Sequence, residues 1–177
     1  MPILIHLCLY GIYTHCTLSD MYNNKYIITM ATQEETDERY MEMAIHEAEL
    51  AYEQDEVPVG CVIVANGRIL GRGHNLTETL QDVTAHAEMQ ALTAAAQTVG
   101  GKYLPDATLY VTVEPCVMCA GAIGWAQIGR VVYGCDDSKR GFRQLAPSAL
   151  HPKTSITAGV LSARTRTLMQ NFFLAHR

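Results

Sequence analysis

Two short stretches of the chain carry side chains that bind metals and move protons: His86-Ala87-Glu88 and Pro115-Cys116-Val117-Met118-Cys119. Imidazole nitrogen and thiolate sulfur are preferred zinc ligands, and a structural zinc site closes its tetrahedron with four protein side chains. Here the count is three, His86, Cys116 and Cys119, which is typical of a catalytic site that leaves the fourth position to water. Glu88 is then placed to act as general acid and base beside that water.

The spacing of these residues predicts the elements that hold them. If Pro115 takes the first position of a helix, Cys116 and Cys119 project from one face of that helix toward one point. His86 introduces a second helical run, and a helix N-terminus favours a bound thiolate. We therefore expect two helix N-termini to converge on one ion. A purely structural zinc site, or a redox pair of cysteines, is the alternative interpretation.

Length and charge limit the possible partners. The 177 residues are 49% hydrophobic, enough for one core, so we expect a single domain over residues 30–177. The net charge of −5 argues against a nucleic-acid partner. However, residues 1–128 carry 5 Lys/Arg against 16 Asp/Glu, whereas residues 129–177 carry 8 against 2. The basic last third suits contacts to phosphates, or is simply a solvated basic face.

Residues 1–29 differ from the rest of the chain. They are apolar and aromatic with one basic residue, Lys25, and they lack the positive start of a secretory signal. The stretch is also too interrupted to span a bilayer, so no membrane association is predicted. We expect these residues to lie outside the core, as an extension or because translation starts at Met30. The scattered cysteines indicate a reducing cytoplasm.

Hydrophobic periodicity predicts alternating helices and strands. The first helix runs to about Gln54, capped by Thr36 or Asp37, with a buried stripe at three- and four-residue spacing that includes Tyr40 and Tyr52. Asn66-Gly67 predicts a hairpin turn. The expected strands are 61–65, 68–75, 107–113, 129–134 and 155–157, and the other helices are the run after His86, 116–126 and one from 161. This order indicates parallel strands with the site outside their carboxyl ends.

Three further positions carry weaker signals. Asn75 ends the second strand and can hydrogen-bond a base edge, although Asn is also a common turn residue. Lys139, Arg140 and Arg143 flank Gly141 and Phe142, a possible phosphate-and-base contact or a solvated loop. Phe172 and Phe173 are interpreted as residues that dock the last helix.

With these residues in view, the chain from about Asp37 onward resembles the bacterial tRNA adenosine deaminases of the cytidine deaminase superfamily. The resemblance rests on short motifs spread along the chain, namely Glu56-Val57-Pro58-Val59-Gly60, Gly73-His74-Asn75, Thr84-Ala85-His86-Ala87-Glu88, 112–122, 128–134, the turn 139–141 and Phe172-Phe173.

The resemblance implies an α/β fold, a three-layer α/β/α sandwich with a five-stranded mixed sheet, assembled as a homodimer whose subunits share the anticodon loop of a tRNA stem-loop. It implies zinc-dependent hydrolytic deamination of the wobble adenosine to inosine, with one Zn²⁺ per subunit held by His86, Cys116 and Cys119. Glu88 would protonate the ring nitrogen and then the leaving amine. Residues matched to substrate contacts are Asn75, Val57, Pro58, Ala87 and Pro115.

The chain departs from the family pattern at Val83 and over 123–127, and it has a short basic tail. These departures bear on how RNA is held and leave the metal set intact. Two other functions stay open. One is a deaminase of a free nucleobase or nucleoside such as guanine, cytosine or adenosine. The other is a non-catalytic RNA-binding subunit with structural zinc, for which Cys61 is the nearest candidate fourth ligand.

Overall fold

The computed structural model describes residues 31–176, and the expectation for residues 1–29 lies outside this part. From Thr32 onward the chain forms one compact unit. Its elements alternate along the chain as α2 (Gln33–Glu53), β1 (Gly60–Ala65), β2 (Arg68–His74), α3 (Ala87–Val99), β3 (Thr108–Val113), α4 (Val117–Trp125), β4 (Arg130–Cys135), α5 (Phe142–Leu145), β5 (Ser155–Ala158) and α6 (Ser162–Ala175).

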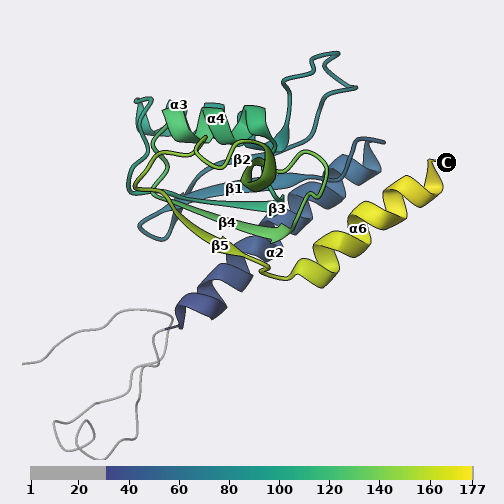
Figure 1. Ribbon diagram of the computed structural model, residues 1–177, viewed down its shortest axis with the longest axis horizontal. Helices are drawn as coiled ribbons and strands as arrows, with labels where there is room; N and C mark the ends of the chain where they lie inside the picture. Colours follow the sequence, from purple (N-terminus) through teal and green to yellow (C-terminus); the bar gives the residue numbers. More distant parts are fainter. Residues whose placement is uncertain (1–30, 177) are drawn as a thin grey trace, which may run out of the picture. The chain divides into compact units, whose positions relative to one another are not determined.

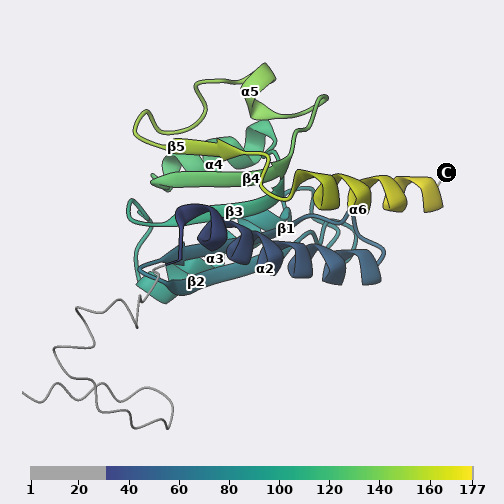
Figure 2. The ribbon, with the colours of Figure 1, turned by 90° about the horizontal axis from the view of Figure 1, so that it is seen from below.

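The five strands form one mixed sheet in the order β2-β1-β3-β4-β5 (Figure 2). Helices α3 and α4 cover one face of this sheet, and α2 and α6 cover the other (Figure 1). Alternate residues of β1 face the two layers: Cys61 and Ile63 pack with α3, whereas Val62 and Val64 pack with α2. The predicted three-layer α/β/α sandwich is therefore confirmed.

Strand direction decides where a site can form. β1 runs antiparallel to β2 and to β3, while β3, β4 and β5 are parallel. The chain after β3, the chain after β4 and the start of β1 consequently share one edge of the sheet, which is the edge that α/β proteins use for ligands. Asn66 and Gly67 form the predicted hairpin turn with φ of 50° and 72°.

Helix α2 begins earlier than the sequence predicted. Thr32 is its N-cap: the Glu35 N–H donates to Thr32 Oγ1 at 3.1 Å, and the Thr32 N–H donates to Glu35 Oε2 at 2.7 Å. The prediction that Thr36 or Asp37 caps the helix was wrong, because this reciprocal pair already satisfies the first turn. Asp37 instead lies one turn inside the helix and is buried.

Two aromatic predictions also need correction. Tyr52 is not in the buried stripe of α2; it is 37% exposed and contacts the edge of Phe172 at a ring-centroid distance of 5.9 Å. Phe172 docks α6 as predicted, but Phe173 is 50% exposed. Adjacent helical residues point about 100° apart, so only one of the two can face the sheet.

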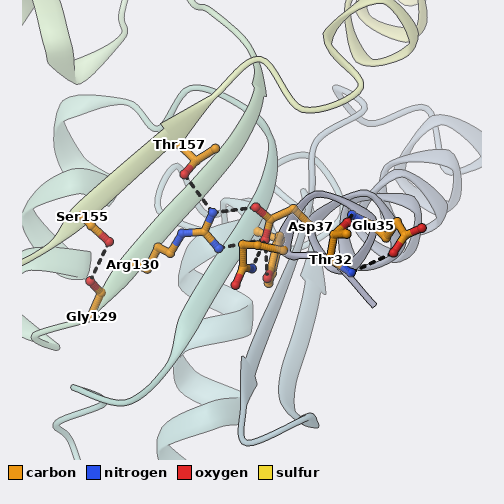
Figure 3. A network of polar contacts seen from close by, with 9 residues as sticks. Thr32, Glu35, Asp37, Gly129, Arg130, Ser155 and Thr157 are labelled. Carbon is orange, nitrogen blue, oxygen red and sulfur yellow. Dashed lines mark hydrogen bonds and ion pairs between the residues drawn. The ribbon is translucent and has the colours of Figure 1, made fainter. Parts of the chain in front are cut away.

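A partly buried ion pair joins elements that are distant in the sequence (Figure 3). The Arg130 guanidinium donates to the two Asp37 carboxylate oxygens at 2.8 and 2.5 Å and also to Thr157 Oγ1 at 2.8 Å. The Tyr110 hydroxyl donates to Asp37 at 3.0 Å. Burial tends to raise the pKa of Asp37, but the Arg130 guanidinium and the other donors hold that pKa below its ordinary value. The network ties α2 to strands β3, β4 and β5.

None of the helices over residues 31–176 has the length and apolar character that a bilayer crossing requires.

Replacing Asp37 by alanine is expected to lower the free energy of unfolding by about 3 kcal/mol, because Arg130 loses its buried partner. Urea denaturation measures this. The loss should shrink as the pH falls through the lowered pKa of Asp37, below about 4, where the wild-type carboxylate itself becomes protonated. E42A removes the partner of Arg164 in an exposed pair, and its effect should stay within about 0.5 kcal/mol. Equal effects of D37A and E42A would contradict the assignment.

Candidate functional site

The three candidate zinc ligands lie at the N-termini of two helices. His86 is the N-cap of α3, Cys116 is the N-cap of α4, and Cys119 is in the first turn of α4. The predicted convergence of two helix N-termini is therefore observed. Pro115 was expected at the first helical position, which was wrong: it precedes the N-cap, and its carbonyl accepts from Phe142 N–H at 3.0 Å.

The geometry of this group fits a tetrahedral zinc ion. One ligand atom from each of His86, Cys116 and Cys119 lies within 4.8 Å of the others. His86 Nδ1 is 3.7 Å from Cys116 Sγ and 3.5 Å from Cys119 Sγ. With Zn–N and Zn–S bonds of ordinary length, the edges of such a tetrahedron are about 3.6 Å. Within residues 31–176, Cys61 is not part of this group.

The two cysteines differ in acidity. The hydrogen bond with Cys119 lowers the pKa of Cys116 to about 4, and His86 contributes to the same effect. The hydrogen bond with Cys116, together with burial, raises the pKa of Cys119. The surroundings of Cys116 therefore favour its thiolate, the form in which a cysteine binds a metal.

Glu88 lies in the first turn of α3, two residues after His86, and is only 3% exposed. Burial is the largest cause that raises the pKa of its carboxyl group. A carboxyl group with a raised pKa is a stronger base than an ordinary carboxylate, as a general base requires. Glu88 is not one of the three grouped ligands, which matches its predicted role beside them.

Close packing of α3 on β2 places His86 at the edge of the sheet. A β-carbon at Gly71 would lie 2.4 Å from the Ala91 carbonyl oxygen, and one at Gly73 would lie 2.7 Å from the Ala87 carbonyl oxygen. Only glycine allows the strand to approach the helix backbone this closely. These glycines therefore set how closely the N-terminal part of α3 packs on β2, and this packing positions His86 and Glu88.

Glu114 organises the loop after β4, a role that sequence reasoning missed. Its buried carboxylate accepts from Asp137 N–H at 3.1 Å and from Arg143 N–H at 3.0 Å. A β-carbon at Gly141 would meet that carboxylate at 2.4 Å, and Gly141 forms a backbone bridge with Cys116. The available signal was an acidic residue at the end of a buried strand, immediately before the cysteine motif.

The predicted RNA-contact residues lie on this same loop. Lys139 and Arg140 are exposed. The Arg143 guanidinium donates to the Tyr133 hydroxyl at 2.7 Å and lies 3.9 Å from Asp136, so part of its donor capacity is used within the protein. Phe142 is 1% exposed and belongs to the core. The prediction that Phe142 contacts a base was therefore wrong, because its backbone is tied to Pro115.

The residues matched to substrate contacts line the same edge of the sheet. Asn75 follows β2, and its N–H donates to the Val59 carbonyl at 3.0 Å, beside the start of β1. Pro58, Ala87 and Pro115 are buried, and Val57 is half-buried. Glu56, which sequence reasoning used only as part of a motif, is completely buried beside Asn75.

The fold and this site define a zinc-dependent deaminase. Residues 34–135 match the family described as "Cytidine and deoxycytidylate deaminase zinc-binding region". The chain belongs to this family and, within it, to the tRNA-specific adenosine deaminases, which are zinc hydrolases acting on a C–N bond.

The assignment to the tRNA-specific adenosine deaminases rests on relatives that this chain matches over most of their length. A tRNA-specific adenosine deaminase of Streptococcus pyogenes serotype M18 is 42% identical over 139 residues, covering 76% of this chain and 87% of the relative. That of Bacillus subtilis strain 168 is 42% identical over 142 residues, covering 77% and 88%. A solved structure from a study of A-to-I editing by tRNA:A34 deaminases at the wobble position is 40% identical, with a TM-score of 0.69 over 73% of this chain and 98% of that one.

One similar solved structure is named for a free base and not for tRNA. Guanine deaminase from Bacillus subtilis is 38% identical, with a TM-score of 0.54, over 56% of this chain and 64% of that one. The match to the tRNA:A34 deaminase structure covers more of both chains at a higher TM-score. The fold is therefore similar to structures that are named for a free base and for tRNA.

Serine at Cys119 is expected to reduce bound zinc from about one ion per chain to well below that, because a neutral hydroxyl replaces a thiolate ligand. Metal analysis after gel filtration measures the content. C61S is the matched control: Cys61 is a buried cysteine outside the ligand group, so its serine variant should retain zinc. Loss of zinc in C61S would support a closed, four-ligand structural site instead.

Alanine at Glu114 is expected to free the loop 137–143, since two backbone N–H groups lose their acceptor. Amide hydrogen exchange at Asp137 and Arg143 should accelerate by at least about tenfold, and the unfolding free energy should fall by about 1–3 kcal/mol. E38A, at an exposed position of α2, should leave both unchanged. Unaltered exchange in E114A would show that the loop is held by other contacts.

Proposed function

We propose that this chain converts adenosine to inosine at the wobble position of a tRNA anticodon loop, consuming one water and releasing one ammonia. The observation that carries the proposal is the three-ligand group with the buried Glu88 beside it, at the open edge of the parallel strands. The relatives named for tRNA adenosine deamination, which align over three quarters of the chain, specify the substrate.

In this proposal Glu88 is the group that moves protons. His86, Cys116 and Cys119 would hold Zn²⁺, which when bound supplies a Lewis acid that activates a water near neutral pH. Glu88 would take a proton from the attacking water and give it to the ring nitrogen N1. It would then take the second proton from the new hydroxyl on C6 and give it to the departing amine, which leaves as ammonia. Its raised pKa makes the carboxylate a stronger base than an ordinary glutamate, which suits proton uptake from water.

The rest of the pocket positions the nucleotide. We assign Asn75, Val57, Pro58, Ala87 and Pro115 to substrate contacts, because they surround the same edge of the sheet as the ligand group. Lys139, Arg140 and Arg143 are assigned to phosphate contacts; they lie on the loop that Glu114 holds against Cys116. A nucleotide in an unpaired anticodon loop needs little energy to leave its stack, so an open, basic approach to the pocket is sufficient.

We further propose that the enzyme is a cytoplasmic homodimer. The outward side of α4 carries exposed apolar residues, with Val117 41%, Met118 36% and Trp125 84% exposed. A second copy of the chain would cover them, as the family resemblance implies. Light scattering should give twice the mass of one chain, and W125E should reduce it toward the monomer. A wild-type monomer would reject the proposal.

The assay that decides between substrates compares an anticodon stem-loop with free adenosine, guanine and cytosine. The stem-loop should yield inosine, detected by sequencing, and the free compounds should be inert. The similarity to guanine deaminase makes guanine the important competitor. Turnover of guanine with an inert stem-loop would replace the RNA substrate by a free base.

Glutamine at Glu88 is expected to keep zinc and fold but to lower the turnover number by roughly 10²- to 10⁴-fold, because the proton carrier is lost while its size is retained. Metal analysis, thermal unfolding and inosine formation are measured on the same preparation. A variant that retains zinc and most of its turnover would contradict the role of Glu88.

A further inference from the structure

The guanidinium of Arg143 is anchored to the core of the protein. Arg143 Nη1 donates to Tyr133 Oη at 2.7 Å, and this hydroxyl donates in turn to Asp136 Oδ1 at 3.2 Å. Tyr133 belongs to β4 and is completely buried, so its position is fixed by the core. The backbone N–H of Arg143 donates to Glu114 at 3.0 Å. Both the backbone and the charged end of Arg143 are therefore held in place.

The other two basic side chains of this loop, Lys139 and Arg140, differ from Arg143 in this respect. Their backbone N–H groups donate to Asp137 Oδ1 at 2.9 and 3.1 Å. Their charged ends are exposed, and neither has a hydrogen-bond or ion-pair partner among residues 31–176. A free long side chain loses conformational entropy when a ligand immobilises it, whereas an anchored one has already lost it. Arg143 is thus prepared for a contact of fixed geometry.

The anchor leaves one edge of the Arg143 guanidinium free. A guanidinium carries five N–H groups in one plane. The bond to Tyr133 and the longer ion pair with Asp136, at 3.9 Å, both involve Nη1. Within residues 31–176, no hydrogen bond uses Nε or Nη2 of Arg143, and the side chain is 57% exposed. The Nε–Nη2 edge is suited to two oxygens of one phosphate, which a guanidinium binds bidentately.

Arg143 lies beside the metal-ligand group. The Phe142 N–H donates to the Pro115 carbonyl at 3.0 Å, and Gly141 forms a backbone bridge with Cys116. Residues 141–143 therefore run next to the segment that carries Cys116. Phe142 is buried in the core, whereas the side chain of Arg143 reaches the surface. A strand whose target base enters the ligand group brings its nearest phosphates to this part of the surface.

We propose that Arg143 binds one of the two phosphates that flank the target nucleotide, bidentately, and that Tyr133 is the positioning residue that presents its guanidinium. The inference rests on the proposed function, because it requires a nucleotide within a phosphodiester strand. It divides the work of the basic loop: Arg143 selects one phosphate, whereas Lys139 and Arg140 attract the strand through their charge alone.

The test uses anticodon stem-loops in which one flanking phosphate at a time is replaced by an uncharged methylphosphonate. For the zinc-loaded full chain, one of these replacements should lower kcat/KM roughly tenfold, because a bidentate charge-assisted contact is lost. R143Q should lose about as much on the unmodified stem-loop, and the same replacement should then cost it little. The loss should appear as a higher KM with kcat retained, since the contact is remote from the reacting atoms.

Y133F removes the anchor and keeps Arg143. It should raise KM and reduce the cost of the same methylphosphonate, because a mobile guanidinium must be ordered on binding. Y103F is the matched control: Tyr103 is exposed and precedes β3, at the opposite edge of the sheet, so its variant should keep the wild-type values. R140Q makes the same change of charge as R143Q on the same loop. It should lower kcat/KM for all stem-loops alike, so the methylphosphonate should cost it as much as it costs the wild type.

Each outcome has a definite meaning. Inosine formation that neither methylphosphonate impairs overturns this inference and leaves the proposed function standing. Equal costs of the replacement in wild type and R143Q also overturn it, since the phosphate is then held elsewhere. No inosine from the unmodified stem-loop overturns the proposed function itself. Zinc content and thermal unfolding are measured for every variant, and if Y133F does not fold, the comparison of wild type with R143Q and R140Q decides.

Discussion

Three side chains must bring one nitrogen and two sulfurs within 4.8 Å of one another, and the rest of the described structure is arranged to make this possible. Two of the three are N-caps, so two helices must begin near one point. Helix α4 follows β3 directly, and its start is fixed by the sheet. Helix α3 is fixed from the side, through the close approach of its backbone to the glycines of β2. The ligand group is thus the place where two separately positioned helices meet.

Buried acids separate into those that hold structure and the one assigned to proton transfer. Asp37 and Glu56 are surrounded by donors, and each has a pKa below its ordinary value. Glu88 is equally buried, but burial dominates and its pKa is raised. The same side-chain chemistry therefore favours the ionised form in one environment and the protonated form in another. Glu114 uses its oxygens to hold backbone N–H groups, and so shapes the basic loop beside Cys116.

Much of this arrangement was predictable from local pattern. Buried β-branched runs and the Asn66-Gly67 turn specified the strands, and the spacing of His86, Cys116 and Cys119 specified the metal group. What was missed depends on partners distant in the sequence. Nothing near Asp37 indicates that it pairs with Arg130, so it was taken for a helix cap, and nothing near Phe142 indicates that the loop turns it into the core. The hydrogen bonds of Glu56 and Glu114 are likewise visible only once the loops are placed.

The pair of Asp37 and Arg130 joins parts of the chain that are synthesised at different times. The two residues are 93 positions apart, and the chain grows from its N-terminus at several residues per second. Helix α2 packs mainly on β1, β2 and β3, all of which are synthesised before Arg130. The ion pair can therefore form only after β4 has been made, and it then joins β4 and β5 to the elements that precede them.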